Sequence, residues 1–330
     1  MNITKQWLQY PIISKQLTSV NQFINENIQT HHQDLQKALL TMADNGGKYL
    51  RPALLFLSAE AAGEKDKIDN DQLIQLAASI EILHMATLIH DDIIDEADER
   101  RGQASIQTHF GKDVAVYAGD LLFTHFFDLI LRAGADRIYL SKNAHTMHHI
   151  LDGELSQMGA RFNQAQTIEQ YIANVKGKTA ALLKLAAEEG AYFAGADAKK
   201  TQLMAEFGEK IGIAFQIVDD ILDYTGSKNF NKPTLEDLKT GVYSLPILLA
   251  LQNNDLKLAL KKLLDKKDQM TSADISEVQS LLLNSSIIDE SRAFAKKYTD
   301  EAVQILNQLP HSSAQKTLLK ITNKLLTRTL

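Results

Sequence analysis

DQLIQLAASIEILHMATLIHDDIIDEA, residues 71–97, is the stretch of sequence that decides the fold. Its apolar residues recur three and four positions apart, a spacing that predicts an α-helix. The same period governs GDLLFTHFFDLILRAG at 119–134 and MAEFGEKIGIAFQIVDDILDYTG at 204–226. Alternating strand patterns joined by Asn-Gly turns are absent from the sequence. We therefore expect an all-α protein.

The chain of 330 residues shows no internal division. Its turn signals are short, as in NGG at 45–47, RRG at 100–102 and NKP at 231–233, and no low-complexity linker or solenoid repeat separates them. The C-terminal third, with KLALKKLLDKK at 257–267, is typical of amphipathic helices with solvated lysine faces. We expect one domain over residues 1–330, built from many helices.

Composition excludes several classes of protein. A net charge of −6 gives no sign of a nucleic-acid-binding surface, and the lack of cysteine excludes disulfides and thiolate metal sites. The N-terminal MNITKQWLQYPIISKQL lacks the pattern of a signal peptide. No stretch reaches the ~18 uninterrupted apolar residues of a membrane span. We expect a soluble, cytoplasmic protein that can contact a membrane surface peripherally.

The pattern DDxxD occurs twice, as DDIID at 91–95 and DDILD at 219–223, each inside an apolar helix. Residues four apart share a helix face, so Asp91 points with Asp95, and Asp219 with Asp223. Carboxylates beside apolar walls are costly to desolvate unless they are paired. A divalent cation relieves that cost, and Mg²⁺ is usually held by one or two carboxylates plus substrate phosphates. One such motif alone is equally well explained as a solvated helix face, but two copies favour a metal site.

Anionic substrates need cations, and several basic residues accompany the two motifs. Glycines in GGKYLRP at 46–52 allow the backbone to approach a phosphate, and the start of the following helix favours anions. Each lysine alone is better explained as solvated surface. Grouped around the acidic helices, they form a candidate diphosphate clamp, composed of Lys48, Arg51, Arg100, Arg101, Lys178 and Lys232.

The stretch HTMHHILDGE at 145–154 also has metal-ligand types at helical spacing. No ExxH pair of a di-iron bundle accompanies them, so a helix face or subunit interface is the favoured interpretation. Glu154 and Gln157 are candidates for the main cavity wall. The aromatic residues Tyr117, Phe123, Phe126 and Phe127 are interpreted as core or dimer packing.

Taken together, these motifs resemble the trans-isoprenyl diphosphate synthases, the polyprenyl synthetase family. The resemblance covers residues 46–246 in the family's order, and is closest to the catalytic subunit of heptaprenyl-type synthases. It rests on GGKYLRP, EILHMATLIHDDIIDEADERRG, KGKTA, FQIVDDILDYTG and NKPTLEDLKTGVYSLP.

The resemblance implies a large helical bundle around a central cavity, the isoprenoid synthase fold, and usually a dimer. It implies a prenyltransferase that joins isopentenyl diphosphate to an allylic diphosphate, such as farnesyl diphosphate, with about three Mg²⁺ ions. The metal residues would be Asp91, Asp92, Asp95, Asp219, Asp220 and Asp223. The isopentenyl diphosphate pocket would contain Lys48, Arg51, His84 and Arg101, and the allylic diphosphate would contact Arg100, Lys178 and Lys232. Thr179 and Gln216 match the positions that stabilise the allylic cation.

The chain departs from the family pattern at one position. Family members often carry lysine in a GKxTLP segment, whereas GVYSLP places Val242 there. One cation on the allylic side is therefore missing, which puts independent activity in doubt. A heteromer with a small regulatory subunit, or a chain that binds prenyl diphosphates and is active only with a partner, is the alternative.

Small residues one turn before the first motif bear on the length of the product. In the family, bulky aromatics at the positions of Ala86 and Thr87 limit the product to short chains. We expect a hexaprenyl to octaprenyl diphosphate here, unless Leu83 closes the cavity and gives a farnesyl or geranylgeranyl product. The use of the product, in quinone biosynthesis or in lipid carriers, stays open.

Overall fold

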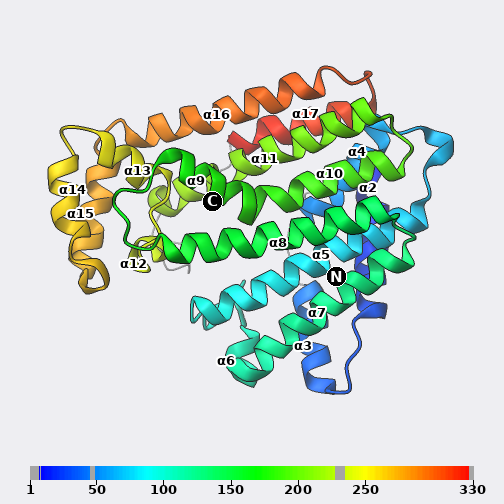
Figure 1. Ribbon diagram of the computed structural model, residues 1–330, viewed down its shortest axis with the longest axis horizontal. Coiled ribbons are helices and arrows are strands. Elements are labelled where there is room, and N and C mark those ends of the chain that lie inside the picture. Colours follow the sequence, from blue (N-terminus) through cyan, green and yellow to red (C-terminus); the bar gives the residue numbers. More distant parts are fainter. Residues whose placement is uncertain (1–6, 8, 45–48, 227–234, 327–330) are drawn as a thin grey trace. The chain divides into compact units, whose positions relative to one another are not determined.

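The computed structural model describes all residues except 1–6, 8, 45–48, 227–234 and 327–330, and it is almost entirely helical (Figure 1). The expected all-α class is confirmed. Contacts divide the chain into two compact units. The first comprises Met1–Asn143, Leu185–Met204 and Leu309–Thr317, and the second comprises Ala144–Lys184, Ala205–Gln308 and Leu318–Leu330. The expected single domain stays a prediction.

Each unit has its own set of helices. Those wholly in the first unit are α2 (Pro11–Asn27), α3 (Gln33–Asp44), α4 (Leu50–Ala62), α5 (Asn70–Ile94), α6 (Ile106–Phe110) and α7 (Lys112–Arg132). Those wholly in the second are α9 (Ile168–Val175), α12 (Glu236–Lys239), α13 (Leu245–Gln252), α14 (Lys257–Leu264), α15 (Ser272–Leu283) and α16 (Ile287–Leu306). Four continue from one unit into the other: α8 (Arg137–Gly159), α10 (Ala181–Phe193), α11 (Ala198–Thr225) and α17 (Ser313–Leu326).

The helix α5 forms the centre of the first unit. Asp69 caps its N-terminus, with its carboxylate accepting from the backbone N–H groups of Asp71 and Gln72 at 3.0 and 3.2 Å. Such a cap satisfies N–H groups that have no partner within the helix. Buried side chains surround most of α5, which explains why its sequence is apolar on all sides.

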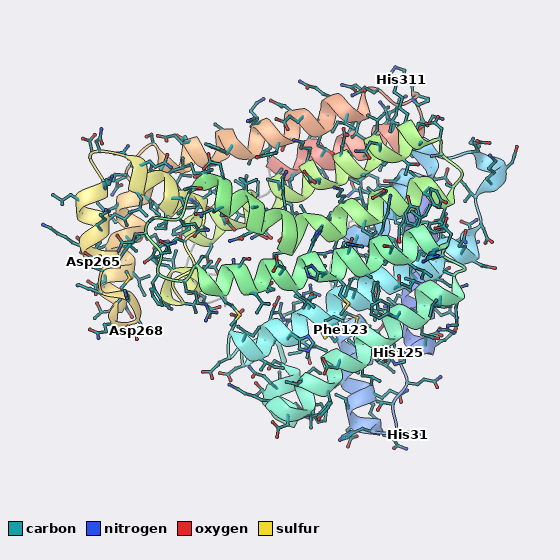
Figure 2. The ribbon with its side chains drawn as sticks, in the orientation of Figure 1. His31, Phe123, His125, Asp265, Asp268 and His311 are labelled. Atoms are coloured by element: carbon teal, nitrogen blue, oxygen red, sulfur yellow. The ribbon has the colours of Figure 1, made fainter. Side chains whose placement is uncertain are left out.

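The helix α5 packs most extensively against α7. At this contact Gly119 faces the imidazole of His90, where a Cβ atom would lie 2.4 Å from the ring. His90 also pairs with Asp120, at 3.3 Å, and its ring lies 5.2 Å from that of Phe123. Figure 2 labels Phe123 on α7. The missing side chain of Gly119 therefore lets the end of α5 that carries the first aspartate motif rest on α7.

Among the described residues, two helices have the length and apolarity of a membrane span, α5 and α7. The apolar window of α5 is 67% buried inside the protein, as in the core helix of a globular protein, whereas that of α7 is 39% buried. Length and composition alone are weak grounds for a membrane span.

One short hairpin accompanies the helices in the part of the chain that the structure describes. Residues Glu99–Arg100 and Gln103–Ala104 pair as a short antiparallel hairpin, β1 and β2. Its turn is formed by Arg101 and Gly102, which both adopt positive φ, 56° and 75°. A two-residue turn with this geometry matches the twist of paired strands. Strands of two residues are too short to show alternation in sequence.

The core of the second unit is built by α9, the central part of α11, α13 and the helices that follow. Its buried residues include Tyr171, Ile217, Tyr224 and Leu248. Two glycines of α11 allow close helix packing: a Cβ on Gly212 would lie 2.6 Å from the Cα of Ala180, and one on Gly208 would lie 2.5 Å from the carbonyl oxygen of Leu183. This close approach brings the KGKTA segment against α11.

Candidate functional site

The first aspartate motif lies at the C-terminal end of α5. Asp91 is half-buried in the last turn, and Asp95 is the exposed residue that caps the helix. The N–H of Asp95 donates to the carbonyl oxygen of Asp91 at 2.8 Å, so the two residues stand one helical turn apart. The predicted pairing of Asp91 with Asp95 along one face of the helix agrees with this backbone geometry.

Asp92 has different surroundings from its two neighbours. Its carboxylate is 3% exposed, and its Oδ1 atom accepts a hydrogen bond from Nε of Arg100 at 2.7 Å and forms an ion pair with Nη2 at 2.5 Å. Burial raises the pKa of Asp92, and the contact with Arg100 opposes that shift. Gln107 holds the loop from the other side by donating to the carbonyl oxygens of Asp92 and Ala97. Asp92 therefore anchors the hairpin that carries Arg100 and Arg101.

Several arginine side chains surround the middle of α5. Burial and the guanidinium groups of Arg51, Arg101 and Arg100 hold the pKa of His84 well below its ordinary value, so its imidazole is neutral. The carboxyl of Glu81 is buried beside the same arginines. Burial raises the pKa of Glu81, while Arg51 and Arg101 act in the opposite direction. Three of the four predicted isopentenyl diphosphate residues thus share one electrostatic environment.

The start of α4 positions Arg51. Tyr49 precedes this helix with a left-handed φ of 48°, and its buried hydroxyl accepts from Asn21 at 2.9 Å. Lys48, predicted to act with Arg51, lies outside the described residues, as does Lys232. Of the two chain-length positions, Ala86 is fully buried in α5 and Thr87 is half-buried, with its hydroxyl donating to the carbonyl oxygen of His84.

In the second unit, the predicted lysine and threonine lie on an irregular helical turn. Residues Lys176–Ala180 form one turn of π-helix between α9 and α10. Such turns are rare and occur often at functional sites. Glycines bring this turn against α8, because a Cβ on Gly177 would lie 2.9 Å from the carbonyl oxygen of His149 and one on Gly153 would lie 2.9 Å from the backbone nitrogen of Lys178.

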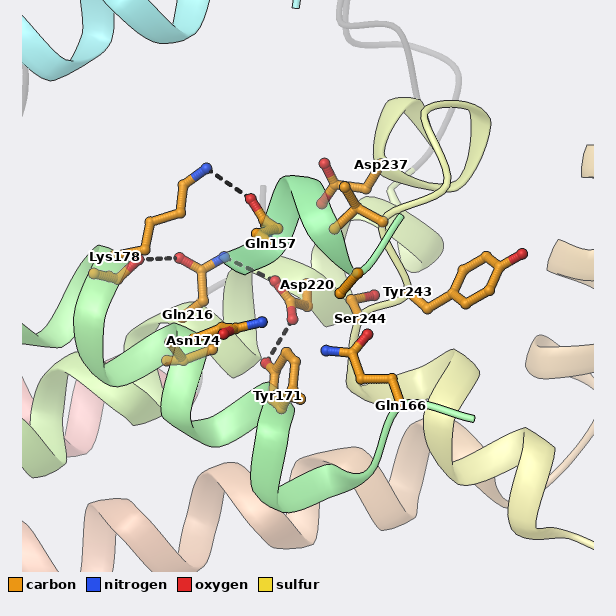
Figure 3. A pocket seen from close by; sticks show the side chains of 14 residues that line it. Gln157, Gln166, Tyr171, Asn174, Lys178, Gln216, Asp220, Asp237, Tyr243 and Ser244 are labelled. Carbon is orange, nitrogen blue, oxygen red and sulfur yellow. Dashed lines mark hydrogen bonds between the residues drawn. The ribbon is translucent and has the colours of Figure 1, made fainter. Parts of the chain in front are cut away.

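The ammonium group of Lys178 contacts α8. It lies 2.8 Å from Glu154. It also donates to the amide oxygen of Gln157 at 3.0 Å (Figure 3). Gln157 lines a pocket of the second unit, whereas Glu154 is not among the residues that line it. Among the residues that line this pocket, Lys178 is the basic one, and the carboxylates are Asp220 and Asp237.

A chain of hydrogen bonds crosses the same pocket (Figure 3). The hydroxyl of Thr179 donates to Oε1 of Gln216 at 2.7 Å, and Nε2 of Gln216 donates to Oδ1 of Asp220 at 2.8 Å. The hydroxyl of Tyr171 donates to the other oxygen of Asp220 at 2.6 Å. Asp220 is 5% exposed, and this burial raises its pKa to about 7, against the lowering effect of its two donors.

The other aspartates of the second motif have different surroundings. Asp219 is half-buried, and Asp223 accepts from the backbone N–H of Leu235 at 3.0 Å. Leu235 adopts a left-handed φ of 63° at the start of α12. Val242, the departure from the family pattern, lines the pocket together with Tyr171, Asp220 and Asp237. An apolar side chain therefore occupies a pocket position where the family often has a cation.

Several residues of these sites were missed in the sequence. Glu81 was hidden among the apolar residues of α5, and Tyr171 lies seven positions before Lys178 with no acidic or basic neighbour to mark it. Asn174 and Asp237 also line the pocket. A buried-helix pattern with one internal carboxyl is the signal that could have identified Glu81.

Neither aspartate motif forms a complete metal site by itself. In the part of the chain that the structure describes, no three His, Asp or Glu side chains are grouped as metal ligands, including those of the 145–154 stretch. Mg²⁺ is usually bound by one or two carboxylates and completed by phosphate oxygens and water. The donors Asp91, Asp95 and Asp219 fit that pattern, whereas Asp92 and Asp220 are held by Arg100 and by Tyr171 and Gln216.

A family model and a curated relative match most of the chain. The family model described as polyprenyl synthetase matches residues 32–282. Component 2 of the heptaprenyl diphosphate synthase of Geobacillus stearothermophilus is 31% identical over 307 residues, which cover 93% of each chain.

Solved structures give the same result. The geranylgeranyl pyrophosphate synthase of Lactobacillus brevis superposes with a TM-score of 0.92 at 40% identity, covering 98% of this chain and 99% of the other. The heptaprenyl diphosphate synthase of Staphylococcus aureus superposes with a TM-score of 0.90 at 32% identity, covering 96% and 98%. The folds of these neighbours are those of isoprenoid synthases.

Proposed function

Because the chain belongs to the polyprenyl synthetase family and is a prenyltransferase, we propose that it condenses isopentenyl diphosphate with an allylic diphosphate, head to tail, to give an all-trans polyprenyl diphosphate. We propose farnesyl diphosphate as the allylic substrate and a hexaprenyl to octaprenyl diphosphate as the product. The similarity to synthases of both heptaprenyl and geranylgeranyl products supports a wider range of lengths. A shorter product is therefore the alternative.

One observation carries this proposal: the first unit combines carboxylates and cations along the C-terminal half of an apolar helix. Asp91 and Asp95 end α5, Asp92 holds Arg100 on the following hairpin, and the neutral imidazole of His84 lies in the field of Arg51 and Arg101. Guanidinium groups bind diphosphate oxygens through charged hydrogen bonds. Carboxylates suit the Mg²⁺ that accompanies a diphosphate.

We propose separate roles for residues of the second unit. Bound Mg²⁺ would supply positive charge that stabilises the departing diphosphate. Lys178 would contact the allylic diphosphate, and the oxygen atoms of Thr179 and Gln216 would face the developing allylic cation. No histidine or glutamate stands out as a dedicated base, so the proton lost after condensation would pass to the released diphosphate.

The experiment is to incubate the purified chain with isopentenyl diphosphate, farnesyl diphosphate and Mg²⁺, with a chelator control, and to measure products by mass spectrometry. Asp91→Ala should lower turnover by about a hundredfold or more, because it removes a ligand of the charge-stabilising metal. Asp71→Ala, an exposed aspartate in the first turn of the same helix, is the matched control. Wild-type turnover by Asp91→Ala, with helix content unchanged, would refute the role of this motif.

A second candidate function is that of a subunit that works only with a partner. The relative from Geobacillus stearothermophilus is named component 2, and Val242 leaves the pocket with Lys178 as its basic lining residue. Tight binding of farnesyl diphosphate without any product would favour this candidate over the self-sufficient synthase. A cytoplasmic location, peripheral membrane contact on release of the product and a role in quinone biosynthesis stay predictions.

A further inference from the structure

The amide of Gln216 has two possible orientations, and its neighbours select one of them. The amide nitrogen of Gln216 donates to Oδ1 of Asp220 at 2.8 Å, and Oδ2 of the same carboxyl accepts from the Tyr171 hydroxyl at 2.6 Å. The amide oxygen of Gln216 is therefore directed towards Thr179.

This orientation also determines the direction of the Thr179 hydroxyl. A glutamine Oε1 atom only accepts, so the 2.7 Å contact uses the hydroxyl proton of Thr179. What Thr179 then presents to the rest of the pocket is the lone pairs of its oxygen. Lone pairs stabilise a cation and repel an anion, so the arrangement is suited to a positive charge that develops on a substrate carbon.

Tyr171 is the residue that keeps the carboxylate of Asp220 in place. Its hydroxyl, on α9, donates to the second oxygen of Asp220 at 2.6 Å, and the side chain is 6% exposed. Burial raises the pKa of the Tyr171 hydroxyl well above its usual value, so it remains a donor. Both oxygens of Asp220 are thus engaged, and the carboxylate is unable to rotate without breaking one of two buried hydrogen bonds.

We propose that Tyr171 is a positioning residue, which acts through Asp220 and Gln216 to aim the oxygen of Thr179 at the developing allylic cation. The proposal rests on the proposed prenyltransferase function. It assigns Tyr171 no contact with the substrate, and it assigns Asp220 a hydrogen-bonding role within the pocket.

The test compares two ligands of the same shape and different charge. One is a farnesyl diphosphate analogue with an ammonium nitrogen near the reacting carbon, and the other is farnesyl thiodiphosphate, which keeps the anionic diphosphate but has no positive charge near that carbon. We expect Tyr171→Phe to weaken binding of the ammonium analogue about tenfold relative to binding of the thiodiphosphate. This factor corresponds to the loss of roughly one hydrogen bond to a charged group. Titration calorimetry of the wild-type and variant proteins measures both dissociation constants.

The chain offers a matched control in the same pocket. Tyr243 is 2% exposed, and its hydroxyl has no hydrogen-bond partner among the described residues. Tyr243→Phe should leave the ratio of the two dissociation constants unchanged. If Tyr171→Phe changes both dissociation constants by the same factor, or changes neither, the positioning role is overturned.

Two further outcomes keep the proposals distinguishable. If the wild-type chain binds neither analogue and forms no product, the prenyltransferase function fails, and the role of Tyr171 fails with it. If Tyr171→Phe does not fold, the role of Tyr171 is tested in the wild-type protein instead. NMR of isotope-labelled tyrosine then measures how fast the Tyr171 hydroxyl proton exchanges with solvent. Slow exchange is expected for a proton donated to a buried carboxylate, and fast exchange would contradict the proposal.

Discussion

The side chain of Glu189 carries a buried carboxyl that the proposed chemistry does not use. It is fully buried in the first unit, where Asn143 donates to its Oε1 atom. Its Oε2 atom and the amide oxygen of Asn143 have no partner among the described residues. Burial raises the pKa of Glu189 to about 8, against the lowering effect of Asn143. A proton on the Glu189 carboxyl removes the charge that would otherwise be buried there.

This shift predicts how stability depends on pH. The folded state holds the proton of Glu189 up to about pH 8. The unfolded chain releases this proton near the ordinary glutamate value of about 4.3. The contribution of Glu189 to the free energy of unfolding is thus full below the unfolded pKa and is lost as pH rises towards 8, by at most about 1.4 kcal/mol per pH unit. Glu189→Gln should remove this loss, measured by urea unfolding at pH 5 and pH 8.

A matched control removes the charge of an exposed glutamate, so that the effect of burial on the pH dependence of stability can be distinguished from the effect of losing a charge. Glu64 is an exposed glutamate of the same unit that pairs with Lys67. Glu64→Gln should retain the wild-type difference in stability between pH 5 and pH 8. The same difference in Glu189→Gln as in wild type would show that Glu189 is ionised in the folded protein.

A substitution of Ala86 tests whether this one side chain limits the length of the product. A phenylalanine at this fully buried position of α5 should shorten the product if the growing chain passes beside it. Overpacking typically costs about 1–3 kcal/mol, so the melting temperature must be measured beside the product masses. Leu83→Ala distinguishes the alternative, since it should lengthen the product if Leu83 closes the cavity. An unchanged product from a folded Ala86→Phe variant would remove Ala86 from the set of length determinants.

At the scale of elements, helix packing depends on glycine where backbones touch. In the first unit, a Cβ on Gly190 of α10 would lie 2.0 Å from the carbonyl oxygen of Leu55 on α4. Backbone atoms are unable to rotate away as a side chain does. Gly190→Ala should therefore lower the free energy of unfolding by about 1–3 kcal/mol or more, measured by urea titration.

The control for this prediction is another helical glycine. A Cβ on Gly159, the last residue of α8, would meet no atom within 4 Å. Gly159→Ala should be neutral or should stabilise the protein by up to about 1 kcal/mol, because alanine restricts the unfolded chain. Similar losses of stability in both variants would show that the close approach of α10 to α4 is not what requires glycine.

The elements differ in how far the sequence determines them. The periodic pattern predicted α5, α7 and α11 correctly in type, but it placed the start of α7 at Gly119 instead of Lys112. The helix begins directly after Gly111, whose φ of 89° ends α6, and a backbone conformation of this kind leaves no period in the sequence. The π-helical turn at Lys176–Ala180 was likewise invisible, since it depends on packing against Gly153.

In the candidate sites, too, the sequence predicts features that depend on local helix geometry but not contacts between distant residues. The spacing of Asp91 and Asp95 follows from helix geometry and was predicted. The pairing of Asp92 with Arg100 and the hydrogen bond between Tyr171 and Asp220 join residues 8 and 49 positions apart, so only the folded chain brings them together. Three aspartates in a motif can therefore have three environments, although their sequence suggests one role.

At the scale of the whole molecule, α7 exposes apolar side chains on its surface. Tyr117 and Leu131 are 75% and 60% exposed, and Val116 and Phe127 also reach the surface of this helix. Apolar side chains clustered on a surface are typical of protein interfaces. The sequence analysis interpreted Tyr117 and Phe127 as core or dimer packing. Their exposure excludes the core of this chain, and a second copy of the chain is the occupant that we propose.

A double substitution tests this interface. Tyr117→Glu with Leu131→Glu should convert a dimer into single chains, because charges buried without partners are costly at an interface. Sedimentation analysis measures the mass, and Leu258→Glu, at a 69% exposed leucine of the second unit, is the control that should keep the wild-type mass. If the wild-type protein already sediments as a single chain, the apolar face of α7 is left for the small regulatory subunit. Adding that subunit should then raise both the mass and the yield of polyprenyl diphosphate.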